Sequence, residues 1–136
     1  MFHNLQIDKN WTAKIADFDI AKVNNEVSKN TMHVGTSYYI APEVVLGFNY
    51  NEKCDVFSFA MIMVEIATNK MLHFEPYVEV KMANNPTLRP KIPEAILEAN
   101  QMWWFADLAA KCWEHDPQQR PSFTEIEDAL LEHMNQ

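Results

Sequence analysis

The residues that decide the fold lie mid-chain, where positions 55–68 read Asp-Val-Phe-Ser-Phe-Ala-Met-Ile-Met-Val-Glu-Ile-Ala-Thr. Ten of these fourteen residues are apolar, and they are spread around the whole circumference of a helix. A helix that is apolar all round needs neighbours on every side, because a one-sided contact would leave apolar surface in water. The stretch therefore predicts a central helix, and it gives a first indication that part of its surroundings lies outside these residues.

The segments on either side of this helix predict a mainly α chain with one short hairpin. Alternating apolar residues on both sides of the turn sequence Asp8-Lys9-Asn10 predict two antiparallel strands. The further helices that we expect are one opening at Pro42, one over residues 76–83, one over 100–113 and one beginning at Ser122. In the last of these, Ser122 and Glu125 form a capping box. Its buried face would consist of Phe123, Ile126 and Leu130. We expect one domain: a short N-terminal β-hairpin followed by about five helices.

Composition excludes several classes of function. The net charge is −8 and the chain has two arginines, Arg89 and Arg120, which argues against nucleic-acid binding. The longest apolar run, residues 59–64, is too short to span a membrane, and the first residues lack a signal-peptide pattern. Cys54 and Cys112 are interpreted as reduced thiols, so we expect a cytoplasmic protein.

Glycine is scarce, and this bears on nucleotide binding. The chain contains two glycines, Gly35 and Gly47, where a domain of this length would carry roughly nine or ten. Glycine-rich phosphate loops need several glycines close together, because only glycine lets the backbone approach a phosphate closely. Any nucleotide chemistry would therefore need residues beyond this sequence.

The open end of the predicted hairpin brings two hard oxygen ligands together. Asn4 starts the first strand and Asp17 ends the second. An amide oxygen and a carboxylate at one strand terminus suit Mg²⁺, which prefers hard oxygen ligands. The alternative from these residues alone is a strand-edge Asn and a turn Asp.

Five motifs occur in an order that resembles a known family. They are Asn4-Leu-Gln-Ile-Asp8, Lys14-Ile-Ala-Asp17-Phe18-Asp19, Gly35-Thr-Ser-Tyr-Tyr-Ile-Ala-Pro-Glu43, Asp55-Val-Phe-Ser-Phe-Ala60 and Cys112-Trp-Glu-His-Asp-Pro-Gln-Gln-Arg-Pro121. Together they cover essentially the whole chain. The sequence resembles the C-lobe of a eukaryotic protein kinase and is most similar to the tyrosine-kinase-like group of Ser/Thr kinases.

The resemblance implies roles for the loop residues. Asn4 matches the catalytic-loop Asn and Asp17 the Asp of Asp-Phe-Gly, so both would hold Mg²⁺ on the phosphates of ATP. Residues 17–43 would form the activation segment, in which Thr36 matches the Thr typical of Ser/Thr specificity. The candidate phosphosites are Ser28, Thr31 and Ser37, where a phosphate could order the segment. Ordinary polar loop residues are the alternative explanation for these three.

The resemblance also implies structural roles. Glu43 and Arg120 match a buried ion pair of the family, which ties the activation segment to the loop between the last two helices. Asp55 matches the residue that opens the central helix. Trp113 matches a Trp that packs beneath the same region.

Departures from the family pattern leave three interpretations open. The catalytic-base Asp would precede Asn4 by five residues, so it falls before Met1, and the Gly-rich loop and the phosphate-gripping Lys are also missing. Asp19 replaces the Gly of Asp-Phe-Gly, and Ala60 replaces a central-helix Gly. We therefore expect the isolated chain to be inactive. It is part of a Ser/Thr protein kinase acting on protein substrates, a degenerate kinase-like module that docks a partner through exposed apolar surface, or a helical domain with accidental motifs.

Overall fold

A computed structural model describes residues 5–10, 12–15, 37–72 and 75–134. The chain divides into two compact units, Met1–His33 and Val34–Gln136, and each is described by itself. Among the described residues, the first unit contributes a β-hairpin and the second contributes all the helices. The mainly α composition is as the sequence predicts.

The hairpin consists of β1 (Leu5–Ile7) and β2 (Ala13–Ile15). The strands pair antiparallel, and Gln6 lies opposite Lys14 at the centre of the register. Both strands fall on the alternating residues that predicted them.

Asp8 organises the turn of this hairpin. Its Oδ1 accepts hydrogen bonds from the backbone N–H groups of Asn10, at 2.8 Å, and Thr12, at 3.0 Å. Its Oδ2 lies 3.2 Å from the Lys14 ammonium. These bonds, above all that from Thr12, lower the pKa of the Asp8 carboxyl. A short carboxylate that captures nearby backbone donors is the usual reason for Asp in a turn, as the sequence predicted.

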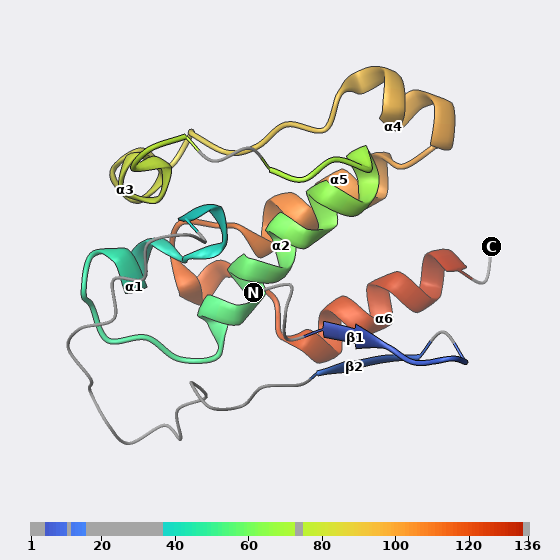
Figure 1. Ribbon diagram of the computed structural model, residues 1–136, viewed down its shortest axis with the longest axis horizontal. Coiled ribbons are helices and arrows are strands. Elements are labelled where there is room, and N and C mark those ends of the chain that lie inside the picture. Colours follow the sequence, from blue (N-terminus) through green and yellow to red (C-terminus); the bar gives the residue numbers. More distant parts are fainter. Residues whose placement is uncertain (1–4, 11, 16–36, 73–74, 135–136) are drawn as a thin grey trace. The chain divides into compact units, whose positions relative to one another are not determined.

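The second unit is an assembly of helices (Figure 1). In chain order its elements are η2 (Ser37–Tyr39), α1 (Pro42–Val45), α2 (Lys53–Thr68), α3 (Val78–Asn84), α4 (Glu94–Asn100), α5 (Trp103–Cys112), η3 (Pro117–Gln119) and α6 (Phe123–Met134). Helix α2 packs along α5, while α1, η2 and α3 pack together near the first half of α2. Helix α4 lies against α5.

Helix α2 supplies the centre of this unit. Phe57, Ala60 and Met61 have no exposed surface, and Ala109 and Cys112 of α5 complete the contact. Ala60 carries a fully buried methyl group, so the site has room for the residue that replaces the family's glycine. The central position predicted for residues 55–68 is confirmed within this unit.

The helix boundaries differ from the prediction in one important place. The described residues contain six α-helices rather than about five, because the helix expected over residues 100–113 is preceded by the separate helix α4. The two are divided at Gln101, which has a left-handed backbone with φ of 52°. A non-glycine residue in this conformation is uncommon, so nothing in the sequence marked the break. The prediction also started α2 two residues late and α3 two residues early.

Helix α6 begins with the predicted capping box. The Glu125 carboxylate accepts the Ser122 N–H at 2.7 Å, and the Glu125 N–H donates to the Ser122 hydroxyl at 3.2 Å. Ile126 is buried, as expected, but Phe123 is 46% exposed. The expectation of a buried Phe123 is therefore wrong: its ring lies edge-on to Phe59 of α2, with centroids 5.9 Å apart, at the border of the core.

Apolar side chains also reach the surface of the helical unit. Ile66 at the end of α2 is 65% exposed, and the nearby Met71 is 67% exposed. Phe48, in the segment that joins α1 to α2, is 63% exposed. None of the described helices has the length and hydropathy needed to cross a bilayer.

Candidate functional site

The best-defined polar site joins α1 to the segment that precedes α6. Glu43 lies in the first turn of α1, and Arg120 follows η3. Arg120 Nη1 donates to Glu43 Oε1 at 2.7 Å, and Nη2 donates to Oε2 at 2.8 Å. The Arg120 side chain is fully buried and the Glu43 side chain is 6% exposed. The structure thus brings these two sequence-predicted residues together in a two-pronged pair, 77 residues apart in the chain.

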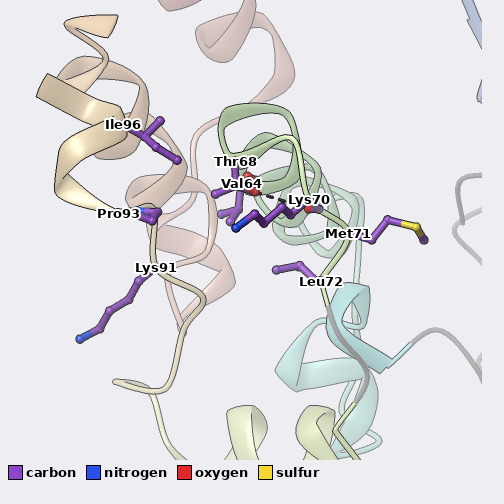
Figure 2. Close-up of a pocket in the computed structure, with 8 residues that line it drawn as sticks. All are labelled: Val64, Thr68, Lys70, Met71, Leu72, Lys91, Pro93 and Ile96. Atoms are coloured by element: carbon purple, nitrogen blue, oxygen red, sulfur yellow. Dashed lines mark hydrogen bonds between the residues drawn. The ribbon is translucent and has the colours of Figure 1, made fainter. Parts of the chain in front are cut away.

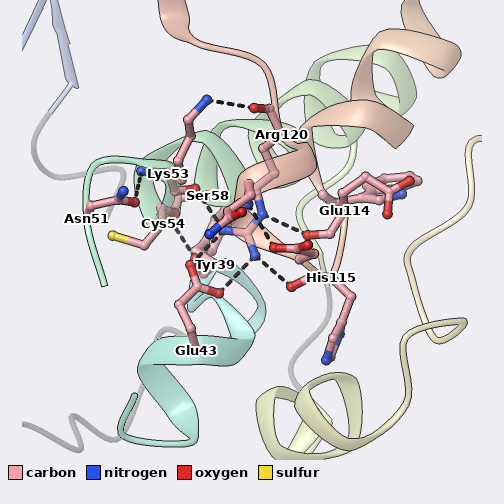
Figure 3. Close-up of polar contacts among 12 residues, drawn as sticks. Tyr39, Glu43, Asn51, Lys53, Cys54, Ser58, Glu114, His115 and Arg120 are labelled. Atoms are coloured by element: carbon pink, nitrogen blue, oxygen red, sulfur yellow. Dashed lines mark hydrogen bonds and ion pairs between the residues drawn. The ribbon is translucent and has the colours of Figure 1, made fainter. Parts of the chain in front are cut away.

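The remaining donors of Arg120 are also satisfied. Its Nε donates to the carbonyl of Glu114 at 2.7 Å, Nη1 donates to that of Lys53 at 2.8 Å, and Nη2 donates to that of His115 at 3.3 Å. With the two bonds to Glu43, all five N–H groups of the guanidinium have an acceptor. Figure 3 shows these bonds converging on one side chain from three parts of the chain. A buried cation needs such complete pairing, because its hydration has been lost.

Lys53 and Arg120 each donate a side-chain hydrogen bond to the backbone carbonyl of the other. The Lys53 ammonium donates to the carbonyl of Arg120 at 2.7 Å, while the Lys53 carbonyl accepts from Arg120 Nη1. Lys53 is the first residue of α2, so the first turn of the central helix is tied directly to the segment before α6. The ion pair thereby fixes α1, α2 and the end of η3 to one another.

Arg89 is a second cation at this site, which sequence reasoning missed. It is half-buried between α3 and α4 and donates to the carbonyls of Leu88, at 2.8 Å, and Trp113, at 3.2 Å. Its Nη1 also lies 3.3 Å from the carbonyl of Met82. The sequence carried one signal for it: Arg89 is the other arginine of a chain that has two.

Both guanidinium groups lie over the same aromatic ring. The Cζ atom of Arg120 lies 5.1 Å from the centroid of the Phe57 ring, and that of Arg89 lies 5.3 Å from it. Phe57 belongs to α2 and is fully buried. A cation over an aromatic face is attracted by the negative charge of that face. The central helix thus supplies one apolar platform for both arginines.

A second buried contact fixes η2 on the central helix. The hydroxyl of Tyr39 donates to Glu65 Oε1 at 2.6 Å, and the backbone N–H of Leu72 donates to the same oxygen at 2.7 Å. Ser58 donates its hydroxyl to the carbonyl of Tyr39 at 2.6 Å. Burial and the Glu65 carboxylate raise the pKa of Tyr39 well above its ordinary value. Residues 39–43 are therefore held on α2 directly at Tyr39, and through Arg120 and the Lys53 carbonyl at Glu43.

Three further residues adjoin this site in the chain: Cys54 and Asp55 follow Lys53, and Trp113 precedes Glu114. Partial desolvation, reinforced by the Glu52 carboxylate, raises the pKa of Asp55, an exposed residue in the first turn of α2. Burial and the carboxylates of Asp55 and Glu43 raise the pKa of the Cys54 thiol to about 12, against the opposing charge of Arg120. Trp113 ends α5, is half-buried and packs against the core, as expected of it.

Seven residues singled out in the sequence lie outside the described part of the chain: Asn4, Asp17, Asp19, Ser28, Thr31, Gly35 and Thr36. Ser37 is the first residue of η2. Within the described residues, no three His, Cys, Asp or Glu side chains are placed to hold a metal ion.

Comparison with known proteins gives the family. The sequence model of the protein kinase domain matches residues 2–131. The dual specificity protein kinase shkE of Dictyostelium discoideum is 38% identical over 136 residues, covering 95% of this chain and 18% of that protein. The serine/threonine-protein kinase STY46 of Arabidopsis thaliana is 37% identical over 132 residues, covering 95% of this chain and 22% of that protein.

A mainly α unit built on a central helix, with a buried pair between the motif ending in Glu43 and the motif containing Arg120, is the C-lobe arrangement of a protein kinase. The chain belongs to the protein kinase family. It spans about a fifth of the length of these two relatives.

Proposed function

We propose that this region is part of a protein kinase that transfers the γ-phosphoryl group of ATP to Ser or Thr residues of proteins. The observation that carries the proposal is the anchoring of residues 39–43 at both ends: Tyr39 bonds to Glu65 of α2, and Glu43 pairs with Arg120, which in turn bonds to the first residue of α2. Phosphoryl transfer depends mostly on positioning and charge neutralisation. A segment fixed at one end on the central helix and at the other end by a buried ion pair supplies a rigid support for a protein substrate.

Asn4 and Asp17 are the residues that would hold Mg²⁺-ATP. An amide oxygen and a carboxylate are the hard ligands that Mg²⁺ prefers. The ion would neutralise negative charge on the phosphates. Asp19 adds a second carboxylate near Asp17 and replaces a glycine of the family pattern. Asp19 thereby weakens the proposed metal site without removing its ligands.

The Ser/Thr specificity that we propose rests on Thr36 and on the names of relatives. One similar protein is a serine/threonine-protein kinase, and another is a dual specificity protein kinase. We assign the chain to the tyrosine-kinase-like group and place it in the cytoplasm. Ser28, Thr31 and Ser37 are proposed phosphosites of its activation segment.

A second candidate is a degenerate kinase-like module that binds a partner without transferring phosphate. The substitution at Asp19 favours it, as does the exposed apolar surface that includes Phe48 and Ile66. Residues 1–136 alone contain neither a His-Arg-Asp motif nor a Gly-rich loop. We therefore propose that a polypeptide of these residues has no transferase activity by itself.

The test uses the natural protein that contains this region. We expect it to transfer labelled phosphate from Mg²⁺-ATP to a mixed Ser/Thr/Tyr substrate, with phosphoserine and phosphothreonine as products. Asp17→Asn should reduce the rate at least about a hundredfold, because charge stabilisation at the phosphates is lost. Asp128→Asn, at an exposed position of α6, is the matched control and should retain full activity.

The outcomes separate the two candidates. No transfer, with no stabilisation of the natural protein by Mg²⁺-ATP, would favour the partner-binding module. Transfer that survives Asp17→Asn would contradict the assigned metal site. A polypeptide of residues 1–136 should show no metal-dependent rise in melting temperature with ATP, because a ligand stabilises only a fold that binds it.

A further inference from the structure

A cleft lies between the end of α2 and the segment that leads into α4. Its volume is about 220 Å³, and its apolar walls are Val64, Leu72, Pro93 and Ile96 (Figure 2). Val64 belongs to the buried core, whereas Pro93 is exposed. The cleft therefore reaches from the core to the surface and can admit an apolar group from outside.

Two lysines border this cleft. The Lys70 side chain reaches back across it, and the Lys91 side chain extends from its other side to solvent (Figure 2). Both are exposed, and neither forms an ion pair with another described residue. The chain as a whole carries a net charge of −8. The border of the cleft is therefore positively charged in a chain that is acidic as a whole. A positive border around an apolar cleft favours a ligand that carries both negative charge and an apolar part.

The size of the cleft narrows the choice of ligand. Pockets for small molecules usually enclose about 300–1,000 Å³, so this cleft is smaller than that range. Its volume suits one large aliphatic or aromatic side chain, the usual anchor of a protein–protein contact. Met71 also lines the cleft and is 67% exposed. An exposed, flexible methionine can adjust to the shape of such an anchor.

We propose that this cleft binds an acidic segment of a partner protein. One apolar side chain of the segment enters between Val64 and Ile96, and carboxylates on either side of it contact Lys70 and Lys91. The apolar contact supplies affinity, and the two lysines select against basic segments. Binding needs no nucleotide and no phosphoryl transfer, so it stands or falls independently of the proposed function.

The test uses a fluorescent peptide with one leucine flanked on each side by two glutamates. We expect saturable binding to the natural protein that contains this region, measured by fluorescence anisotropy without nucleotide. Replacing Lys70 and Lys91 together with glutamate should weaken binding at least about tenfold, because attraction becomes repulsion. Lys9→Glu makes the same kind of change at an exposed residue that does not line the cleft. It should change the affinity less than about twofold.

Variants of the peptide test the two parts of the proposal separately. Alanine in place of the leucine should weaken binding about fivefold or more, because the apolar anchor is lost. Equal binding of a peptide with lysines in place of glutamates would overturn the proposal, as would equal affinity of the Lys9 and cleft variants. Failure of the peptide to bind, or its displacement by octanoate at similar concentration, would also overturn it. Displacement by octanoate would indicate that the cleft is a site for small amphiphilic acids.

Discussion

The two arginines of this chain lie over the same ring, that of Phe57, but they differ in their burial and in their hydrogen-bond partners. Arg120 is 2% exposed and faces the Glu43 carboxylate, with three backbone carbonyls completing its shell. Arg89 is half-buried and donates to backbone carbonyls, with its Nη2 3.4 Å from His115 Nδ1. Among the described residues, Arg89 forms no ion pair.

The difference shows how burial decides what a cation needs. A guanidinium that has lost its water is stable only beside an opposite charge with every donor used. Arg89 keeps part of its hydration, so carbonyl dipoles are sufficient. Its pKa is nevertheless lowered, first by burial and then by the positive charge of Arg120. The two residues therefore predict different costs of removal.

The largest effect is expected for Arg120→Ala. The change leaves Glu43 buried without its partner, and stranding a buried charge costs about 3–5 kcal/mol of unfolding free energy. Urea unfolding of the chain would measure the loss. Lys111→Ala, at an exposed position of α5, is the control and should change stability by less than about 0.5 kcal/mol.

A double variant sharpens this expectation. Glu43→Gln combined with Arg120→Met removes both charges together, so it should cost less than the sum of the two single changes. An unchanged melting temperature for Arg120→Ala would show that the ion pair does not hold α1 to the segment before α6.

A smaller effect is expected for Arg89→Ala. The change removes donors from neutral carbonyls, including those of Leu88 and Trp113, and strands no charge. Unsatisfied buried polar groups cost about 1–3 kcal/mol, so the loss should be below that of Arg120→Ala. Arg89→Lys should recover only part of it, because an ammonium cannot reproduce the planar fork of a guanidinium. Equal losses of unfolding free energy for Arg89→Ala and Arg120→Ala in the same urea assay would contradict the conclusion that the buried ion pair makes Arg120 costlier to remove.

The smallest expected effect is on the pH dependence of the unfolding free energy, and it arises from the thiol of Cys54, whose pKa is influenced by Glu43 and Arg120. The pKa of Cys54 is raised to about 12 in the folded chain, above its ordinary value. Its contribution to stability is therefore complete below the ordinary thiol pKa, and it is lost as the pH rises toward 12. Urea midpoints at about pH 8.5 and 10.5 should fall less in Cys54→Ala than in the wild type.

Cys112 has the same raised pKa and remains in both proteins, so a reduced slope is expected rather than none. Removal of Arg120 takes away the charge that favours the Cys54 thiolate, so the pKa of Cys54 in the folded chain should rise further. The decline due to Cys54 should then begin at the same pH, near the ordinary thiol pKa, and extend to higher pH. Identical slopes for the wild type and Cys54→Ala would contradict the assigned environment of this thiol.

Local patterns predicted much of the helical unit. The apolar residues 55–68 marked the central helix, and Ser122 with Glu125 marked the start of α6. The Gly35–Glu43 and Cys112–Pro121 motifs pointed to the pairing of Glu43 with Arg120. These features depend on residues close in the chain or on a recognisable motif, so they can be read without coordinates.

Other features depend on contacts that local patterns do not encode. Arg89 stood out in the sequence only as one of two arginines, because its acceptors are backbone carbonyls that every sequence possesses. The bond from Tyr39 to Glu65 joins residues 26 apart, and it buries a Glu side chain, a type that is almost never fully buried unless it is paired. The break at Gln101 depends on a left-handed backbone that its residue type does not announce.

The sequence by itself determined that this chain is mainly helical, belongs to the protein kinase family and carries motifs in the order of a C-lobe. These follow from apolar periodicity and from residue types at fixed spacing. Only the tertiary structure decided which cations are buried, which carbonyls receive them and that two lysines border an apolar cleft. Burial and hydrogen-bond partners are properties of the packed chain, because they depend on which distant segments exclude water from one another.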